Sequence, residues 1–346
     1  MHQTHGMVEE RADPASPDAG RGSRLVSVVV PVYNERDGIA EFHRRLAAVL
    51  DRLPHAGEIV YVNDGSTDGS LAALLEIRAA DGRAAVIDLS RNFGKEVAMT
   101  AGIDHARGDA VVVIDADLQD PPELIPELLR WWEEEGYDVV YARRESRAGE
   151  TALKKLTSYL FYRVIGRLSR VDLPPDSGDF RVLSRRAVDG LMRVREQHRY
   201  MKGLFSWIGY RQKAVSYRRE PRHAGKTKWN YVRLWNFSLE AITSFSVLPL
   251  KVATYLGLLV ALFAFCYGGL IIFRTLAFGS DVPGYPSIMV VVLLLGGIQL
   301  TFIGVLGEYV ARIFGETKQR PLYLIQDIHE SSPTAGSRPV DGRRAP

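Results

Sequence analysis

The sequence predicts an α/β domain on a mostly parallel, doubly wound sheet, followed by two helices that cross a membrane. Three observations predict it. Short apolar strands alternate with amphipathic helices over residues 25–142, the pattern of a parallel sheet covered on both faces. Polar residues follow the ends of four of these strands. Two long uncharged runs occupy the last third of the 346-residue chain.

The expected strands are short, apolar and rich in β-branched residues, which is typical of strands buried on both faces. They cover residues 25–32, 58–62, 84–89, 110–114 and 139–142. Apolar residues at helical spacing predict helices over residues 38–53, 71–77, 94–106 and 123–132. A polar loop over 176–181 is expected to lead into a short strand at 181–183.

The fourth strand leads into two carboxylates, Asp115 and Asp117, with Gln119 close behind. Alternate residues of an extended chain point the same way, so these three side chains are expected to converge. Their oxygen atoms suit a hard divalent cation, Mg²⁺ or Mn²⁺, and such a cation suits a diphosphate. The alternative for a lone D-x-D pair is a strand that simply ends in a polar turn.

Polar residues also follow the first three strands, at Asn34 and Glu35, at Asp64 and at Arg91. The carboxyl ends of parallel strands share one edge of the sheet, where open α/β sheets bind ligands. The glycine-rich run over 65–70 (GSTDGS) matches neither a dinucleotide fingerprint nor a P-loop. We therefore expect a ligand cleft that is acidic and holds any diphosphate through a metal.

Charge is distributed unevenly, although the formal net charge is only +3. Residues 143–233 contain 23 lysines and arginines against 8 aspartates and glutamates, which indicates an anionic partner such as phosphates or lipid headgroups. The loop over 217–229 (YRREPRHAGKTKW) is a candidate anion clamp, although such a run also suits a solvated surface. The single cysteine, Cys266, excludes an intrachain disulfide and gives no sign of zinc or thiol chemistry.

Two uncharged runs, at about 252–273 and 285–307, are long enough to cross a ~30 Å hydrocarbon layer at ~1.5 Å per residue. A short link makes them a hairpin over 249–310, and basic flanks place the soluble part in the cytoplasm. Arg274, at the far end of the first run, is a mild counter-signal. The alternative is a pair of core helices in a soluble protein.

The remaining boundaries follow from composition. We expect disordered tails at 1–24 and 331–346. Between them we expect a cytoplasmic domain at 25–228, which contains the expected ligand cleft, and a cytoplasmic segment at 311–330. Amphipathic patterns predict a juxtamembrane helix at 229–248 and another helix at 151–168. The latter suits a membrane surface or a place against the sheet equally well. The first residues contain no apolar h-region of a secretory signal peptide.

Seven motifs occur in order between residues 27 and 324, namely VVVPVYNE, NDGSTD, RNFGKEVAMTAG, DADLQDPPELI, DSGDFR, GKTKW and GEYVARIFGETKQRPLYL. Together they resemble the polyisoprenyl-phosphate glycosyltransferases of glycosyltransferase family two. More closely, they resemble the bactoprenol glucosyltransferases, relatives of dolichol-phosphate mannose synthase. The resemblance implies a GT-A fold in the cell inner (cytoplasmic) membrane, as a multi-pass protein with its catalytic domain in the cytoplasm. It also implies transfer of a hexose, with inversion, from a nucleotide sugar such as UDP-glucose to undecaprenyl phosphate, for cell-envelope glycans.

The resemblance also implies roles for individual residues. Nucleotide-binding roles fall to Pro31, Tyr33, Glu35, Asp64, Lys95 and Asp115. The metal, Mg²⁺ or Mn²⁺, would be held by Asp115, Asp117 and Gln119. Catalytic roles fall to Asp115, Asp117, Asp179 and Arg181, the last two near the acceptor and the transferred sugar. Acceptor-phosphate roles fall to Arg218 and Lys226.

One departure is Asn63, where many relatives have aspartate. The Q-x-x-R-W motif of processive polysaccharide synthases is absent, which favours a single transfer. Other sugars stay open, namely mannose, galactose, N-acetylhexosamine and aminoarabinose. Two other classes also stay open, a nucleotidyltransferase and a non-enzymatic lipid-binding scaffold. Neither explains both the hairpin and the polar strand ends. A nucleic-acid partner is not expected, and a homo-oligomer remains open.

Overall fold

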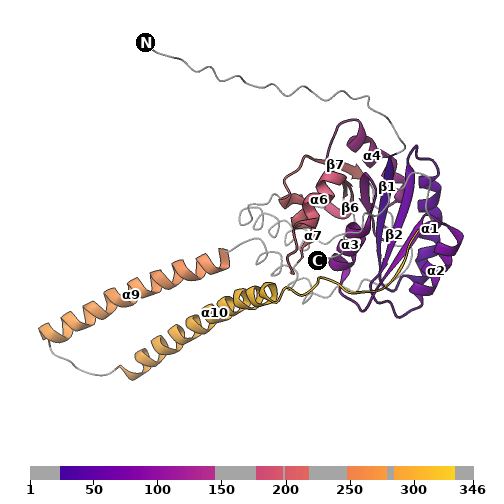
Figure 1. Ribbon diagram of the computed structural model, residues 1–346. Coiled ribbons are helices and arrows are strands. Elements are labelled where there is room, and N and C mark those ends of the chain that lie inside the picture. The colour runs from indigo at the N-terminus through magenta and orange to yellow at the C-terminus, as the bar shows by residue number, and fades with distance from the viewer. Residues whose placement is uncertain (1–23, 145–176, 198, 218–247, 279–283, 332–346) are drawn as a thin grey trace, which may run out of the picture.

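The computed structural model describes residues 24–144, 177–197, 199–217, 248–278 and 284–331. They form an α/β domain and a pair of long helices that extends away from it (Figure 1). Several expectations lie outside the described residues: the two tails, the helices at 151–168 and 229–248, and the basic loop with Arg218 and Lys226.

One eight-stranded sheet forms the centre of the domain, in the order β7-β5-β6-β4-β1-β2-β3-β8. Its strands are β1 (Leu25–Val32), β2 (Ala56–Asn63), β3 (Ala84–Leu89), β4 (Ala110–Val113), β5 (Val139–Arg144), β6 (Ser177–Ser184), β7 (Gln212–Tyr217) and β8 (Ile325–His329). The run β4, β1, β2 and β3 is parallel, and so is the pair of β5 and β7. β6 and β8 run antiparallel to their neighbours.

Helices cover both faces of the sheet, which confirms the predicted doubly wound architecture. One face carries α1 (Arg36–Leu50), α2 (Ser70–Ala80) and α4 (Ile125–Glu133). The other carries α3 (Lys95–His105), α6 (Arg185–Met192) and α7 (Met201–Trp207). Along β1, Val28 and Val30 enter the first core and Val29 enters the second, because successive side chains of a strand point to opposite faces.

Helix α3 lies close to the sheet because its inner face is built from small residues. A Cβ atom at Gly102 would overlap Val29 of β1 and come within 3.0 Å of Val62 of β2. Ala98 and Ala101 are fully buried on the same helix. This close packing fixes the amino end of α3, where Lys95 lies, against the carboxyl edge of the sheet.

Two features differ from the expectations. Residues 177–181, expected to belong to a polar loop over 176–181, are instead the first part of β6, so that expectation is wrong for them. Its pairing explains why: Ser177 lies opposite Arg143, and Arg181 lies opposite both Val113 and Tyr141, so β6 fills the gap between β4 and β5. Two strands were not expected at all, namely β7 and β8, the latter of which follows the long helices.

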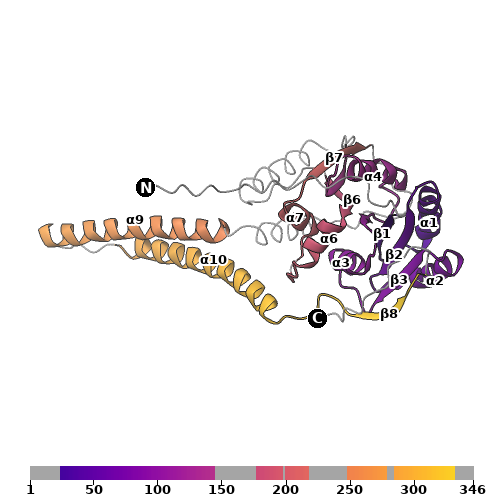
Figure 2. The same ribbon diagram turned by 45° about the horizontal axis from the view of Figure 1, so that its top comes forward.

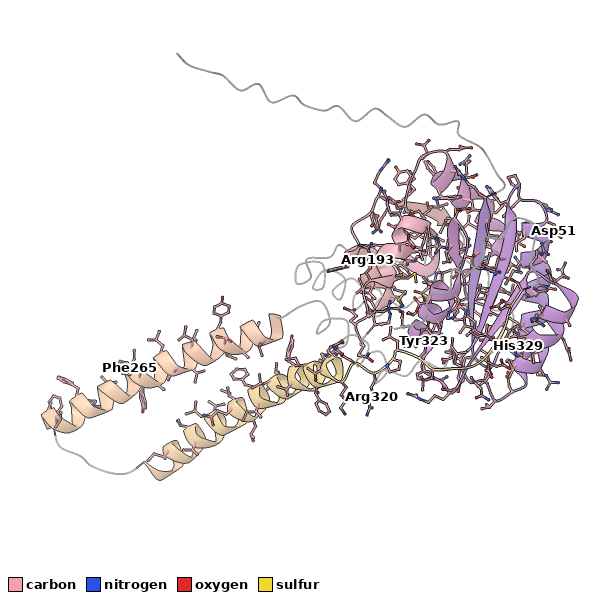
Figure 3. The ribbon with its side chains drawn as sticks, in the orientation of Figure 1. Asp51, Arg193, Phe265, Arg320, Tyr323 and His329 are labelled. Carbon is pink, nitrogen blue, oxygen red and sulfur yellow. The ribbon has the colours of Figure 1, made fainter. Side chains whose placement is uncertain are left out.

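The long helices are α9 (Leu248–Phe278) and α10 (Tyr285–Thr317). Within them, residues 252–270 and 294–317 are long and apolar enough to cross a membrane, and neither stretch is buried inside the protein. Large apolar side chains such as Phe265, which is 82% exposed, point away from the pair (Figure 3). The helices therefore form the expected hairpin, with α10 continuing ten residues past the expected boundary at 307.

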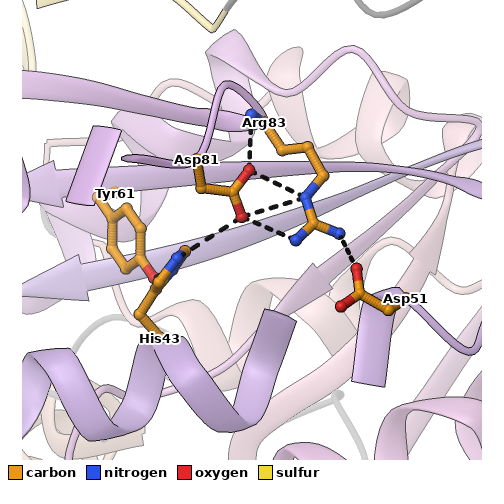
Figure 4. Close-up of polar contacts among 5 residues, drawn as sticks. All are labelled: His43, Asp51, Tyr61, Asp81 and Arg83. Atoms are coloured by element: carbon orange, nitrogen blue, oxygen red, sulfur yellow. Dashed lines mark hydrogen bonds and ion pairs between the residues drawn. The ribbon is translucent and has the colours of Figure 1, made fainter. Parts of the chain in front are cut away.

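Away from the ligand edge, a polar network connects α1 to β2 and to the loop between α2 and β3 (Figure 4). His43 Nδ1 lies 2.9 Å from the hydroxyl of Tyr61, and its Nε2 lies 3.6 Å from Asp81. Arg83 binds Asp81 with two nitrogen atoms and reaches Asp51 at 2.8 Å. Burial lowers the pKa of His43, Asp81 partly offsets that effect, and Arg83 adds to it.

We expect this network to make stability depend on pH. The pKa of His43 lies below its unfolded value of about 6.5. The unfolded chain therefore binds the extra proton first, and the His43 contribution is complete above about pH 6.5 and lost as pH falls towards the folded pKa. The thermal midpoint of the full chain in detergent should fall more between pH 7.5 and 5.5 than that of His43→Gln.

The comparison with His43→Gln is needed because Glu96 acts in the opposite direction. Burial raises its pKa from 4.5 to about 7, so its contribution is lost as pH rises through that range. Glu96 is present in both proteins and cancels in the difference. Parallel pH profiles for the two proteins would contradict the assignment.

Candidate active site

The predicted ligand edge exists at the carboxyl ends of β1, β2, β3 and β4, which are parallel neighbours. Two further segments reach the same edge. Helix α3 starts there with Lys95, and β6 brings Asp179 there because it runs antiparallel to β4. The residues that gather at the edge therefore come from six segments of the chain.

Lys95 joins two of the predicted site carboxylates. Its ammonium lies 2.7 Å from Asp115 Oδ1 and 2.8 Å from Oδ2, and it lies 2.5 Å from Asp179 Oδ2. The side chains of Lys95 and Asp115 are 43% and 27% exposed and that of Asp179 is 9% exposed, so the group opens to solvent on the side away from Asp179. The other oxygen, Asp179 Oδ1, is buried and has no hydrogen-bond partner among the residues that the structure describes.

Burial and mutual attraction have opposing effects on the pKa values of Lys95, Asp115 and Asp179. Burial would raise the pKa of Asp179, but Lys95 and Lys202 outweigh it and hold that pKa well below its usual range. Burial would lower the pKa of Lys95, but Asp115 and Asp179 raise it well above its usual value. Burial raises the pKa of Asp115, Lys95 opposes this, and Asp179 adds to it. Lys95 and Asp179 are therefore charged at neutral pH.

Arg181 is buried behind Asp179 rather than exposed to the cleft. Its guanidinium lies 3.8 Å from the ring centroid of Phe205, on α7, and donates to the backbone carbonyls of Gly178 and Asp179 at 2.7 and 3.2 Å. Burial lowers its pKa to about 10, against the opposing effects of Asp179 and Glu96. Arg181 thus shapes the start of β6 and adds positive potential beneath Asp179.

The loops after β1 and β2 are bound to each other, and this fixes the predicted nucleotide-binding side chains. The backbone N–H of Asn34 donates to Ser66 Oγ at 3.0 Å, and that of Glu35 donates to Ser70 Oγ at 2.9 Å. Tyr33, between Pro31 and these contacts, is 44% exposed. The exposed ring of Tyr33, held on a fixed loop, can therefore pack against a flat ligand.

Asp64 supports the next loop. Its carboxylate, only 2% exposed, accepts hydrogen bonds from the backbone N–H groups of Phe93 and Gly94 at 2.7 and 3.0 Å. Gly65 makes this close approach feasible, because it has a φ of +63° and a Cβ there would lie 2.5 Å from the Asn92 nitrogen. Asp64 therefore holds the residues that immediately precede Lys95.

The convergence of Asp115, Asp117 and Gln119 by strand alternation is wrong, because the chain leaves the extended conformation before it reaches them. β4 ends at Val113, and residues 116–120 turn, with Leu118 at a φ of +58°. Asp117 Oδ1 accepts from the Gln119 backbone N–H at 3.1 Å. Asp115 reaches the edge directly after β4, where Lys95 contacts it, and Asp117 lies in the turn that follows.

These residues fit a divalent cation in their chemistry without forming a complete cage. Among the described residues, no three histidine, cysteine, aspartate or glutamate side chains are grouped to hold a metal. Mg²⁺ commonly needs only one or two carboxylates, with waters and substrate phosphates as its other ligands. Asp115 and Asp117 supply two carboxylates, and the Asp115 carboxylate is held by Lys95.

Comparison with known proteins gives the family. Residues 27–192 match the family model of glycosyl transferase family 2, and residues 248–313 match that of the GtrB C-terminal hairpin. The SfII prophage-derived bactoprenol glucosyl transferase of Shigella flexneri is 44% identical over 308 residues, which cover 89% of this chain and 99% of that protein. The chain belongs to glycosyltransferase family 2.

Two further proteins are similar to this chain. An uncharacterized glycosyltransferase of Synechocystis is 52% identical over 303 residues, covering 88% of this chain and 95% of that protein. Glucosyl-3-phosphoglycerate synthase from Mycobacterium tuberculosis, solved with Mn²⁺ and UDP, is 21% identical with a TM-score of 0.46 over 63% of this chain and 77% of that one. At this distance the latter assigns neither ligand to the present glycosyltransferase.

Sequence reasoning missed several residues of this glycosyltransferase site. Asp120, only 2% exposed, accepts a hydrogen bond from the Tyr217 hydroxyl, which lies 3.4 Å from Arg144. This group ties the 116–120 turn to β5 and β7. The only signal was the carboxylate of Asp120 inside the motif, because its partners come from strands distant in sequence. Glu96, which accepts from the Met201 backbone N–H at 3.2 Å, was missed for the same reason.

The structure also explains why position 63 holds an asparagine, because its side chain pairs with the neighbouring carboxylate of Asp88. Asn63 Nδ2 donates to Asp88 Oδ1 at 2.7 Å, and both side chains are buried at adjacent positions of β2 and β3. An aspartate at 63 would face Asp88 as a second buried carboxylate. We expect Asn63→Asp to cost about 2 kcal/mol of unfolding free energy, since it replaces a hydrogen bond with repulsion.

The second substitution Asp88→Asn should restore the pair with its donor and acceptor exchanged. The measurement is thermal unfolding of Asn63→Asp, Asp88→Asn and the double variant in detergent. Recovery of the midpoint in the double variant is the expected result. A double variant as unstable as the sum of the two single ones would contradict the pairing.

Proposed function

We propose that this chain is an inverting, metal-dependent hexosyltransferase that moves a sugar from a nucleotide sugar, UDP-glucose first, to undecaprenyl or another polyprenyl phosphate. The observation that carries the proposal is the Lys95 bridge between Asp115 and Asp179 at the carboxyl edge of the sheet. It places a D-x-D carboxylate next to the carboxylate of the GDFR motif. The relatives named bactoprenol glucosyl transferase, among them the Shigella protein, and the apolar hairpin support a lipid acceptor.

In the proposed reaction, a phosphate oxygen of the acceptor attacks the anomeric carbon as the bond from that carbon to the donor diphosphate breaks. The nucleoside diphosphate leaves with the bonding electrons, and the sugar is inverted. A divalent cation, held by Asp115 and Asp117 with Gln119, would neutralise charge on the leaving diphosphate. The acceptor phosphate is already anionic near neutral pH, so no strong base is needed.

The protein groups have separate roles in this proposal. Tyr33 and Glu35 line the nucleotide pocket with Pro31, and Asp64 holds the loop that leads to Lys95. Asp179 orients the transferred sugar rather than accepting a proton, because a carboxylate with such a low pKa is a weak base. Lys95 keeps Asp115 and Asp179 in place and offers positive charge to the diphosphate. Arg218 and Lys226 remain the proposed acceptor-phosphate ligands.

The proposed location is the cytoplasmic membrane, with the catalytic domain on the cytoplasmic side and the hairpin crossing twice. A polyprenyl chain cannot leave the bilayer, so its phosphate is available only at the membrane surface. The two apolar helices hold the catalytic domain at that surface. Basic residues flank the hairpin, which favours the cytoplasmic orientation.

The first test is transfer of label from a panel of nucleotide sugars to undecaprenyl phosphate by the purified protein, with Mg²⁺ or Mn²⁺ and with or without EDTA. We expect label in the lipid phase from one donor, UDP-glucose first, and loss of transfer with EDTA. Asp117→Asn should behave like EDTA treatment. Full activity of Asp117→Asn with an unchanged metal requirement would remove Asp117 from the proposed metal ligands.

The Lys95 bridge gives a separate prediction. Lys95→Met should lower kcat/KM for sugar transfer about 100-fold, the loss typical of one preorganised electrostatic contact. Lys95→Arg keeps the positive charge and should retain more activity than Lys95→Met. Equal activity of the two variants would show that the charge at 95 is not what matters.

A further inference from the structure

The chain that leaves α10 turns back to the α/β domain. Residues 318–329, which we name the return strap, run from the end of α10 at Thr317 to the edge of the sheet. Figure 2 shows this path from α10 to β8, and Figure 3 labels Arg320, Tyr323 and His329 along it. The second membrane helix is thus attached to the catalytic domain at its carboxyl end.

The first attachment lies at the end of α10. Glu316 accepts a hydrogen bond from the Gln197 backbone N–H at 2.7 Å, and the Arg320 carbonyl accepts one from Gln197 Nε2 at 2.6 Å. Gln197 lies between α6 and α7, the helix that carries Phe205 under Arg181. The last turn of α10 is therefore bound to the face of the domain that includes α7.

The second attachment is to α3. The Tyr323 hydroxyl donates to Asp104 Oδ2 at 2.8 Å, and Arg195 binds the same oxygen at 2.7 Å. The Asp104 side chain is only 7% exposed. Asp104 lies near the end of the helix that begins with Lys95, so the strap grips the element that carries the bridging lysine.

The third attachment is the strand itself. The Leu324 carbonyl accepts from the Ser90 backbone N–H at 2.9 Å, and Ile325 lies opposite Leu89. Leu89 is the last residue of β3, so β8 enters the sheet at its carboxyl edge, the edge that carries the site. It then runs antiparallel to β3 towards His329, which pairs with Val86.

These attachments limit how far the site can lie from the membrane. Thr317 and Ile325 are eight residues apart, and an extended chain spans at most about 3.6 Å per residue. The end of the second membrane helix therefore lies within about 29 Å of the carboxyl edge of β3. The contacts of Gln197 and Tyr323 fix the path within that limit.

We propose that the return strap positions the catalytic edge for a phosphate that is confined to the membrane surface, with Tyr323, Asp104 and Gln197 as positioning residues. This inference rests on the proposed lipid acceptor. A lipid-borne phosphate cannot leave the membrane surface. The height and orientation of the site above the bilayer therefore decide whether the phosphate reaches the site. Small displacements of reacting groups cost large factors in rate.

The other role of β8 is to cover an exposed sheet edge, which prevents unwanted pairing. That role alone predicts that damage to the strap lowers stability and all activities together. The positioning role predicts a split between acceptors. Transfer to a membrane-embedded acceptor should fall, while transfer to a short-chain, water-soluble polyprenyl phosphate should not.

The experiment uses the full chain in vesicles with a Gly-Ser-Gly-Ser insertion between Arg320 and Pro321. The matched control is the same insertion after Glu135, beside Gly136, where the chain has a φ of +65° and open space. Undecaprenyl phosphate in the vesicles and a short-chain soluble analogue are compared as acceptors. We expect at least a tenfold loss of kcat/KM for the embedded acceptor, less than twofold for the soluble one, and neither loss in the control.

A milder variant guards against misfolding. Tyr323→Phe combined with Asp104→Asn removes the α3 contact without lengthening the chain. This variant should also lose more kcat/KM with the embedded acceptor than with the soluble one, although the loss should be smaller. Equal losses with both acceptors, or no loss with either in the insertion variant, would overturn the proposal.

A distance measurement separates this proposal from the proposed function. A fluorophore at Asp37→Cys, in a Cys266→Ser background, reports its height above labelled lipid headgroups by energy transfer. Asp37 is exposed and lies just after the carboxyl end of β1. The insertion in the strap should weaken the energy transfer, and the control insertion should not. If the wild type transfers no sugar but the height still changes, the proposed function fails, while the control of the height of the domain by the return strap stands. An unchanged height overturns positioning.

Discussion

The arrangement of the site depends on one ammonium group held between two carboxylates. Asp115 follows β4 and Asp179 lies on β6, and two carboxylates in a partly buried site repel each other unless a positive charge compensates them. Lys95 supplies that charge from a third element. Other features serve to place it. Asp64 holds the residues before it, and Gly102 allows α3 to approach the sheet.

A second constraint comes from the membrane. The apolar helices are exposed along their length, and such surfaces are typical of segments that lie in a membrane. The domain cannot rotate freely about this anchor, because α10 is joined to it through Gln197, Tyr323 and β8. The α/β domain and the hairpin are therefore connected parts, and in the proposed function the site takes its orientation from the bilayer.

The sequence predicted what local patterns encode. The first five strands and the hairpin follow from apolar periodicity, and the shared edge of polar residues follows from parallel pairing. It failed where distant segments decide the structure. Residues 177–179 are polar and look like a loop, yet pairing with the distant strand β5 places them in β6. Asp120 finds Tyr217, and Lys95 finds Asp179, only after folding. Motif resemblance named most of the individual residues, but it gave none of these contacts.

The position of β8 in the chain has a consequence for biosynthesis. β3 has β2 on one side and β8 on the other, and β8 is translated after both membrane helices. Until then, β3 is an open edge, which is the kind of surface that invites aggregation or capture by chaperones. The sheet is completed only when the ribosome has finished the hairpin. A chain truncated before residue 325 thus keeps the unpaired edge of β3. That edge is a physical feature by which chaperones can recognise the incomplete chain.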